Sequence, residues 1–253
     1  MYQRAIVKRP CRNLARGLTE AGLGVPDHAL ALRQHDAYIE ALIACGLQVT
    51  VLDAEEEYPD SVFIEDTAVL TPQCAVITRP GAPSRRGETG AVRTAVSHFF
   101  DTIEEIGPEG TLDGGDVMAA GHHLFIGLSR RTSAAGARGL AGILQPYGFS
   151  AATVPLQHVL HLKTGVVFLA NDILVVAGEF VDRPEFRAFT RIVVDPGEEY
   201  AANCLWINDR VLVADGYPRL RARIEAAGFP TIALDMSEFR KLDGGLSCLS
   251  LRF

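Results

Sequence analysis

Four segments of this chain repeat one pattern, in which a polar stretch is followed by a short apolar strand, a tight turn and a second apolar strand. The turns lie at Pro72–Gln73, Gly121–His122, Asn171–Asp172 and Asn208–Asp209. Asn, Asp and Gly are typical of hairpin turns, because they tolerate the backbone angles that a tight turn between two strands requires. The pattern therefore predicts four β-hairpins.

Each predicted hairpin is followed by a connection and a further short strand. The connections at 87–100, 132–148 and 217–228 are predicted helices, as is 27–46, whereas the connection around 184–189 is short and only weakly helical. The strands after these connections are predicted at 48–52, 102–106, 151–155, 191–194 and 231–235. Since helices alternate with strands, the pattern predicts an α/β fold.

The two ends of the chain supply a fifth hairpin if they pair with each other. Residues 246–253 are predicted to form one strand, and residues 3–10 are its candidate partner. This pairing would close five units, spaced by roughly 40 to 50 residues, into a ring without an open sheet edge. The alternative is a general α/β sandwich in which the hairpins are coincidental.

Such a ring would bring the polar residues at the start of each first strand toward one axis. These residues would share one funnel although they lie far apart in the sequence: Glu65, Asp66, Asp113, Asp116, His161, Asn203 and Cys248. The letters LDGG occur twice, at Leu112–Gly115 and at Leu242–Gly245. Two copies indicate either chance or a repeated unit that places a polar turn at a shared site.

Composition narrows the class of protein. The chain has 253 residues and a formal net charge of −7, which disfavours general nucleic-acid binding and suits a cationic ligand. Its apolar runs are strand-sized, well below the roughly 18 residues of a membrane span. Residues 1–13 carry basic side chains without an apolar core, so no secretory signal is expected there and a cytoplasmic location is predicted. The glycine motifs that bind nucleotides are absent.

The cysteines are odd in number and have no C-x-x-C spacing: Cys11, Cys45, Cys74, Cys204 and Cys248. A disulfide framework and a structural zinc site are therefore not expected. Most of these residues are predicted to be small buried hydrophobic side chains. Cys248 has unusual neighbours, because the glycine pair Gly244–Gly245 would let the backbone approach a ligand closely.

Cys248, His161 and Asp113 could serve as a nucleophile, a base and an orienting acid. A thiol with a pKa of about 8.5 is mostly protonated at neutral pH, so an attacking cysteine needs a nearby base or cation. A histidine at the head of another strand can transfer the proton. Each residue also has a plain interpretation, since a cysteine in an apolar strand usually packs and a lone histidine is usually on the surface or satisfied in the core.

Seven short stretches form a specific combination that runs in order over essentially the whole chain: VFIEDTAV, ITRPGAPSRRGE, TLDGGDVM, LSRRT, VLHLKTG, AANC and the final LDGGLSC. Together they resemble the dimethylarginine dimethylaminohydrolase family of guanidine-modifying penteins. The resemblance implies one pentein catalytic domain over residues 1–253. Its fold would be a five-bladed α/β propeller, a pseudo-fivefold ring closed by pairing of the N- and C-terminal strands.

The resemblance also implies an activity, the hydrolysis of Nω,Nω-dimethyl-L-arginine and Nω-monomethyl-L-arginine to L-citrulline plus dimethylamine or methylamine. It assigns Cys248 as the nucleophile that forms a covalent thiouronium intermediate, His161 as the general acid/base and Asp113 as the partner of that histidine. Some bacterial relatives have Glu in place of the Asp. The implied substrate contacts are Leu18 on a lid loop, Asp60, Glu65, Asp66, Arg85, Arg131 and the backbone at Leu242.

Physical chemistry gives these residue types a reason. A guanidinium is a planar cation with forked donors, so a carboxylate such as that of Asp66 can bind it through two hydrogen bonds. Burying the cation requires acids beside it, and its charge would help to stabilise the thiolate of Cys248. Arg85 and Arg131 would hold the α-carboxylate, and Asp60 the α-ammonium. The reaction needs no metal and no organic cofactor; the expected partner is a small methylated arginine, and an outer face could form a homodimer.

Two other kinds of pentein remain open. Arginine deiminases typically carry an acid two residues after the catalytic histidine, where this chain has Lys163, and many have an inserted helical domain for which this chain has no obvious room. A noncatalytic pentein, such as a translation factor that occupies a ribosomal subunit surface, has no use for a nucleophile and a buried acid cluster.

Overall fold

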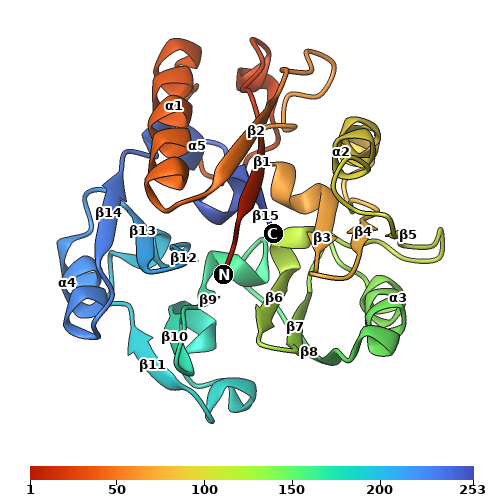
Figure 1. Ribbon diagram of the computed structural model, residues 1–253. Coiled ribbons are helices and arrows are strands. Elements are labelled where there is room, and N and C mark those ends of the chain that lie inside the picture. Colours follow the sequence, from red (N-terminus) through yellow and green to blue (C-terminus); the bar gives the residue numbers. More distant parts are fainter. The chain divides into compact units, whose positions relative to one another are not determined.

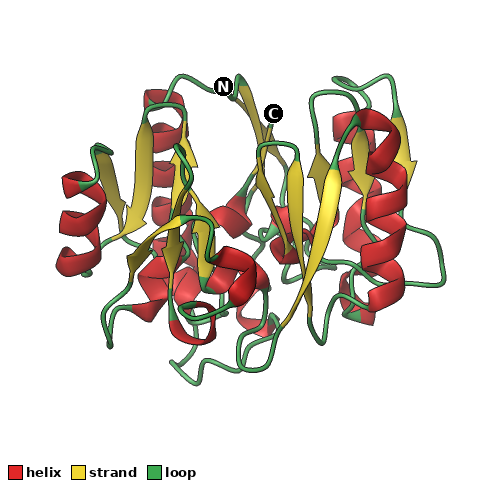
Figure 2. Cartoon of the chain, turned by 90° about the horizontal axis from the view of Figure 1, so that it is seen from below, coloured by secondary structure: helices red, strands yellow, loops and turns green.

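Five three-stranded sheets with the same pairing pattern make up the fold (Figure 1). The computed structural model describes residues 1–253. In every sheet the middle strand pairs antiparallel with one neighbour and parallel with the other. An antiparallel pair needs only a tight turn, whereas a parallel pair needs a longer crossover. Each sheet therefore combines an antiparallel pair with a longer crossover, and in four of the five sheets that crossover contains an α-helix. Figure 2 distinguishes the helices from the strands by colour.

The chain divides into two compact units. The central unit is Glu65–Val193, and the terminal unit combines Met1–Ile64 with Val194–Phe253. The central unit holds three of the sheets and the terminal unit holds two. The prediction of a single domain over 1–253 stays a prediction.

The central unit contains three successive copies of the repeat. The first consists of β3 (Ala68–Leu70), β4 (Ala75–Ile77), α2 (Thr89–Val96) and β5 (Ile103–Glu105). The second consists of β6 (Val117–Ala120), β7 (His123–Leu128), α3 (Ala134–Leu144) and β8 (Ser150–Pro155). The third consists of β9 (Val166–Phe168), β10 (Ile173–Val176) and β11 (Thr190–Val193). Its crossover is two short 3-10 helices, Gly178–Phe180 and Pro184–Phe186, as the weak helical pattern predicted.

The terminal unit contains one continuous copy of the repeat and one copy made from both chain ends. The continuous copy consists of β12 (Leu205–Ile207), β13 (Arg210–Ala214), α4 (Pro218–Ala226) and β14 (Thr231–Leu234). The other consists of β15 (Leu251–Arg252), β1 (Arg4–Lys8), α1 (His28–Ala44) and β2 (Gln48–Leu52), and a short helix, α5, spans Ser237–Arg240. Because β15 pairs antiparallel with β1, the predicted fifth hairpin between the chain ends is confirmed.

The hairpin turns have the backbone angles that their residues favour. Gly121, Asn171, Asp172 and Asn208 have φ values of 60°, 52°, 55° and 56°. This left-handed region suits Gly, Asn and Asp, and it matches the twist of the strands on either side. The predicted hairpins at these positions are confirmed.

One predicted strand is wrong in its extent. Residues 246–253 were expected to form one strand, but Ser247–Leu249 is a 3-10 helix and only Leu251–Arg252 pairs with β1. The alternating apolar residues of this stretch gave the strand pattern. The side chains of Leu246 and Leu249 are nevertheless buried from a helical turn, which an apolar pattern of this length does not distinguish from a strand.

Middle strands of the sheets are the most apolar and the most buried, which is the usual pattern for strands covered on both faces. In the central unit, β10 buries Leu174, Val175 and Val176 completely. In the terminal unit, β13 buries Val211 and Leu212. No helix of this chain combines the length and the apolar character that crossing a membrane would require.

Candidate active site

A 3-10 helix lies just before the first strand of each sheet. These helices are Ile64–Thr67, Gly114–Asp116, Leu162–Thr164, Glu199–Ala202 and Ser247–Leu249. The polar residues singled out in the sequence lie in or directly beside them: Glu65, Asp66, Asp113, Asp116, His161, Asn203 and Cys248. They therefore occupy equivalent places in the five repeats.

The predicted site residues are divided between the two units. Glu65, Asp66, Arg85, Asp113, Arg131 and His161 lie in the central unit. Leu18, Asp60, Leu242 and Cys248 lie in the terminal unit. Contacts within each unit are described below, and the meeting of Cys248 with His161 stays a prediction.

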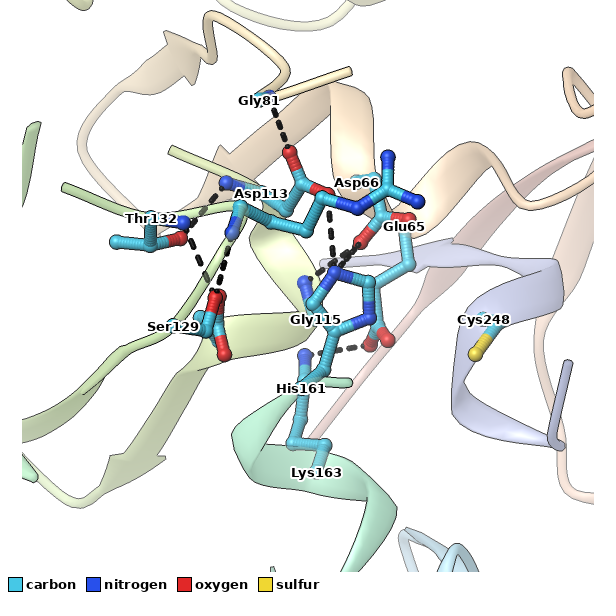
Figure 3. Close-up of polar contacts among 12 residues, drawn as sticks. Glu65, Asp66, Gly81, Asp113, Gly115, Ser129, Thr132, His161, Lys163 and Cys248 are labelled. Atoms are coloured by element: carbon cyan, nitrogen blue, oxygen red, sulfur yellow. Dashed lines mark hydrogen bonds and ion pairs between the residues drawn. The ribbon is translucent and has the colours of Figure 1, made fainter. Parts of the chain in front are cut away.

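His161 and Asp113 form a buried pair in the central unit (Figure 3). The Nε2 atom of His161 lies 2.9 Å from Oδ2 of Asp113. The other oxygen of Asp113 accepts a hydrogen bond from the backbone N–H of Gly81 at 2.8 Å, which holds the carboxylate in place. Asp113 is completely buried, so its carboxylate can orient the imidazole ring without competition from water.

Asp66 lies near the same ring nitrogen of His161 and is held by two further groups. Its Oδ1 atom lies 3.9 Å from Nε2 of His161 and accepts the N–H of Gly115 at 2.9 Å. Its Oδ2 atom lies 2.5 Å from Nη1 of Arg85. Arg85 also pairs with Glu88, with 2.8 Å between Nη2 and Oε2. Since all of these side chains are buried, the carboxylate of Asp66 is kept fixed beside the imidazole.

The charges around His161 favour its protonated form. Burial alone would lower the pKa of this histidine, but the negative charge of Asp66 and the hydrogen bond with Asp113 outweigh that effect and raise its pKa to about 9. Burial would likewise raise the pKa of Asp66, but the positive charges of His161 and Arg85 lower it. At neutral pH the central unit therefore presents an imidazolium that can donate a proton.

Asp116 supports the segment that carries His161, and its carboxylate is fully buried. One carboxylate oxygen accepts the backbone N–H of Leu162 at 2.9 Å, and the other accepts the hydroxyl of Ser129 at 2.6 Å. The sequence placed Asp116 in the predicted funnel but gave it no role. Glu88 was not identified at all, although its spacing of three residues from Arg85 on a helical turn is the signal for such a pair.

Glu65 is neutralised by Lys163. The Nζ atom of Lys163 lies 2.6 Å from Oε1 of Glu65, and both side chains are mostly buried. Lys163 precedes the third repeat of the central unit, and the carboxylate with which it pairs precedes the first repeat. The charge that Glu65 could offer to a cationic ligand is therefore reduced.

Arg131 has a buried guanidinium nitrogen without a partner. Its Nη1 atom is inaccessible to solvent and makes no hydrogen bond. An unsatisfied buried donor of a charged group is costly, so an anionic ligand would be stabilised there. That Arg131 binds the α-carboxylate, as the family resemblance implies, stays a prediction.

Three side chains of the central unit could in principle hold a metal ion. Asp66, Asp113 and His161 each offer a ligand atom, and these atoms lie within 4.8 Å of one another. Each of the three is already engaged, because Asp66 pairs with Arg85 and Asp113 bonds to His161. An imidazolium cannot ligate a metal, so the cluster is better suited to proton transfer than to metal binding.

In the terminal unit, Asp60 and Leu18 are joined by a hydrogen bond. The N–H of Leu18 donates to Oδ1 of Asp60 at 2.9 Å. Asp60 is buried, whereas the side chain of Leu18 is 43% exposed. Asp60 thus fixes the start of the loop that the sequence identified as a lid.

Cys248 is the only one of the five cysteines that is not buried. The N–H of Gly245 points to its sulfur at 3.4 Å, and its own N–H donates to the carbonyl of Gly245 at 3.2 Å. The thiol therefore lies on a tight helical turn rather than in an extended strand. Leu242, three residues before Gly245, is buried in the core of the terminal unit.

Comparisons with known proteins show which family the chain resembles. Residues 26–194 match the family model for eukaryotic N,N dimethylarginine dimethylhydrolase. The curated N(G),N(G)-dimethylarginine dimethylaminohydrolase of Pseudomonas aeruginosa is 49% identical over the full length of both chains. The enzyme of the same name from Streptomyces coelicolor is 39% identical, over 99% of this chain and 96% of its own.

Solved structures confirm the predicted pentein fold class. A cysteine-to-serine mutant of the Pseudomonas aeruginosa enzyme, complexed with citrulline, matches with a TM-score of 0.99 at 49% identity over 100% of both chains. The N-terminal domain of ArgZ, covalently bound to a reaction intermediate, matches with a TM-score of 0.89 over 98% of this chain and 97% of its own. Its 19% identity supports a shared fold alone. Taken with the full-length match at 49% identity, these findings establish that the chain belongs to the dimethylarginine dimethylaminohydrolase family.

Proposed function

We propose that this chain hydrolyses Nω,Nω-dimethyl-L-arginine and Nω-monomethyl-L-arginine to L-citrulline, with release of dimethylamine or methylamine. Relatives at 49% and 39% identity carry the name of this activity, and one of them is solved with citrulline bound. The observation in this chain that carries the proposal is the buried His161–Asp113 pair, whose imidazolium lies beside the carboxylate of Asp66. Such a pair is suited to protonating a leaving amine.

In the proposed complex, Asp66 and Glu65 lie around the substrate guanidinium. Both carboxylates already face a cation, since Asp66 pairs with Arg85 and Glu65 pairs with Lys163. Asp66 stays ionised, because His161 and Arg85 lower its pKa. The added cation would compete with the proton on His161 and lower the pKa of that histidine. Binding of substrate therefore prepares the histidine to give up its proton.

Cys248 supplies the nucleophile in this mechanism. Its thiolate attacks the central guanidinium carbon, and His161 donates a proton to the nitrogen that carries the methyl groups. The carbon–nitrogen bond then breaks, the amine leaves, and a covalent thiouronium remains on the sulfur. His161, now neutral, takes a proton from water, whose oxygen attacks the same carbon. The carbon–sulfur bond breaks, which releases citrulline and restores the thiolate.

The remaining predicted residues bind the amino-acid end of the substrate. Arg131 and Arg85 bind the α-carboxylate, and Arg131 is expected to contribute more, because its buried Nη1 has no partner and Arg85 already pairs with two carboxylates. Asp60 binds the α-ammonium. Leu18 on the lid loop and the backbone at Leu242 complete the predicted contacts.

The test is citrulline formation from asymmetric dimethylarginine, monomethylarginine and arginine. We expect turnover of both methylated substrates and little turnover of arginine. Cys248→Ser and His161→Gly should each lower kcat by about a thousandfold or more. Cys11→Ser is the matched control, because its sulfur lies near two backbone carbonyls to which a hydroxyl can also donate. A preference for unmodified arginine would identify a deiminase instead, and an unreactive Cys248 without turnover would identify a binding protein.

A further inference from the structure

The side-chain amide of Asn203 forms two hydrogen bonds with Ser247, in the turn that carries Cys248. Its Oδ1 atom accepts the backbone N–H of Ser247 at 2.9 Å, and its Nδ2 atom donates to the hydroxyl of Ser247 at 3.2 Å. Asn203 is buried, and it follows the 3-10 helix Glu199–Ala202 in the neighbouring repeat. A buried amide that uses a donor and an acceptor on one residue fixes that residue in position and in rotation.

Two further contacts fix the same turn in position. A Cβ atom on Gly245 would lie 2.5 Å from Cγ of Asn203, so only glycine leaves room for the amide. The hydroxyl of Tyr200 donates to the carbonyl of Gly244 at 2.8 Å. Tyr200 and Asn203 therefore hold the two ends of the segment Gly244–Ser247, Gly244 and Ser247, from one neighbouring element.

The contacts of Asn203 and Tyr200 together fix the position of one backbone donor. The N–H of Gly245 points to the sulfur of Cys248 at 3.4 Å. A backbone N–H aimed at a sulfur stabilises the thiolate more than the thiol, because the charged acceptor forms the stronger hydrogen bond. A small rotation of the turn would break this contact, since it joins a backbone N–H to a side chain three residues later in the same turn.

We propose that Asn203, assisted by Tyr200, is a positioning residue for the nucleophile, which keeps the N–H of Gly245 directed at the sulfur of Cys248. The catalytic consequence rests on the proposed function, but the effect on the thiol does not. Neither residue needs to touch the substrate for this role. The sequence placed Asn203 in the predicted funnel without a role, and this contact supplies one.

Other charged groups near this turn must be held constant in a test. Arg252 donates to the carbonyl of Ser247 at 3.1 Å, and Arg240 lies 5.0 Å above the ring of Tyr200. Burial raises the pKa of Tyr200, so its hydroxyl stays neutral over the range in which a thiol titrates. Substitutions at Asn203 and Tyr200 that introduce no charge therefore test the position of the turn, and not a change in the electrostatic field at the thiol of Cys248.

The experiment measures the thiol of Cys248 in the absence of substrate. The thiolate absorbance and the rate of alkylation by iodoacetamide are followed between pH 6 and about 10.5 for the wild type, Asn203→Ala and Tyr200→Phe. Cys248→Ser gives the background from the four buried cysteines. The matched control is Asn208→Gly, which removes an amide that holds the backbone of Tyr2 and Cys45 in the same unit and suits the φ of 56°.

Asn203→Ala should raise the pKa of Cys248 by about one unit and slow its alkylation at pH 7.5 by about tenfold. Tyr200→Phe should shift both in the same direction by about half as much. Asn208→Gly should lower the melting temperature without changing the thiol. With methylarginine, Asn203→Ala should lower kcat with little change in KM.

Two results would overturn the inference: a folded Asn203→Ala variant whose thiol titrates like the wild type, or, if that variant does not fold, a Tyr200→Phe variant whose thiol is unchanged. The variants could shift the thiol titration relative to the wild type while the wild-type chain makes no citrulline. That result would support the inference and contradict the proposed function. The two failures are thus distinguishable.

Discussion

The two LDGG segments share their letters but differ in what their aspartates do. Asp113, in the central unit, is completely buried in an extended conformation and bonds to His161. Asp243, in the terminal unit, is exposed, has a φ of 58° and accepts the backbone N–H of Glu20 at 2.6 Å. One carboxylate orients a catalytic candidate, and the other holds a surface loop. Identical sequence therefore does not imply identical chemistry, because the backbone angle at the Asp decides where the carboxylate points.

The second glycine of each LDGG segment, Gly115 or Gly245, leaves space for a polar side chain. A Cβ on Gly115 would lie 2.8 Å from Oδ1 of Asp66, and one on Gly245 would lie 2.5 Å from Cγ of Asn203. The side chain of Asp66 accepts the N–H of Gly115 itself, and that of Asn203 accepts the N–H of Ser247, two residues after Gly245. What the repeat preserves is space for that side chain.

The sharpest test of the difference between the two aspartates is Asp113→Asn. We expect a loss of kcat of about a thousandfold or more, because an amide cannot stabilise the imidazolium and can favour the wrong ring orientation. Asp113→Glu, which keeps the charge, should retain far more activity. Equal activity of the Asn variant and the wild type would show that His161 does not depend on this carboxylate.

The shared role of the glycines predicts similar damage at both. Gly115→Ala and Gly245→Ala should each lower the free energy of unfolding by about 1–3 kcal/mol, since a methyl group would overlap a fixed side chain. Chemical denaturation measures the effect. Gly142→Ala is the control: nothing lies within 4 Å of the added methyl, and in α3 the change should stabilise the protein by about 0.5–1 kcal/mol. A similar gain at Gly245 would contradict the contact with Asn203.

The buried imidazolium predicts a pH dependence of stability in the central unit. The pKa of His161 is raised from 6.5 to about 9, so the stability it contributes is fully present below pH 6.5 and is lost as the pH rises through about 9. Relative to His161→Asn, the wild type should lose on the order of 3 kcal/mol across this window. Denaturation at pH 6 and pH 10 measures the difference, with the exposed His98→Asn as control. A constant difference between the two proteins would mean that folding leaves the pKa of His161 unchanged.

The smallest effect is expected at the exposed aspartate. Asp243→Gly removes the bond to Glu20 but keeps a residue that accepts the left-handed backbone. Unfolding stability should fall by about 0.5–1 kcal/mol, and the loop at residues 17–25 should be cleaved faster by protease. If this variant lost activity as severely as Asp113→Asn, the distinction between the two copies would have to be abandoned.

Much of the fold could be predicted from the sequence because its signals are local. Turn residues such as Asn171 and Asn208 identified the hairpins, and β2 was predicted with its observed limits of 48 and 52. The strand predicted over 246–253 was wrong, because alternating leucines suit a buried helical turn as well as a strand. Pairing of β15 with β1 joins opposite ends of the chain, and it was indicated by the repeat count and by the family resemblance rather than by any local signal.

The sequence by itself determined the residue types of the site and the repeat that carries them: a cysteine after a glycine pair, a histidine and an aspartate, each ahead of a first strand. Only the tertiary structure decided how the buried cations Arg85 and Lys163 are paired. Arg85 pairs with Asp66 and Glu88, and Lys163 pairs with Glu65, whereas the family resemblance already implied that Asp113 partners His161. The physical reason is that partners up to 98 residues apart, as Lys163 and Glu65 are, become neighbours only when sheets of different repeats pack, and burial then sets how strongly each charge acts.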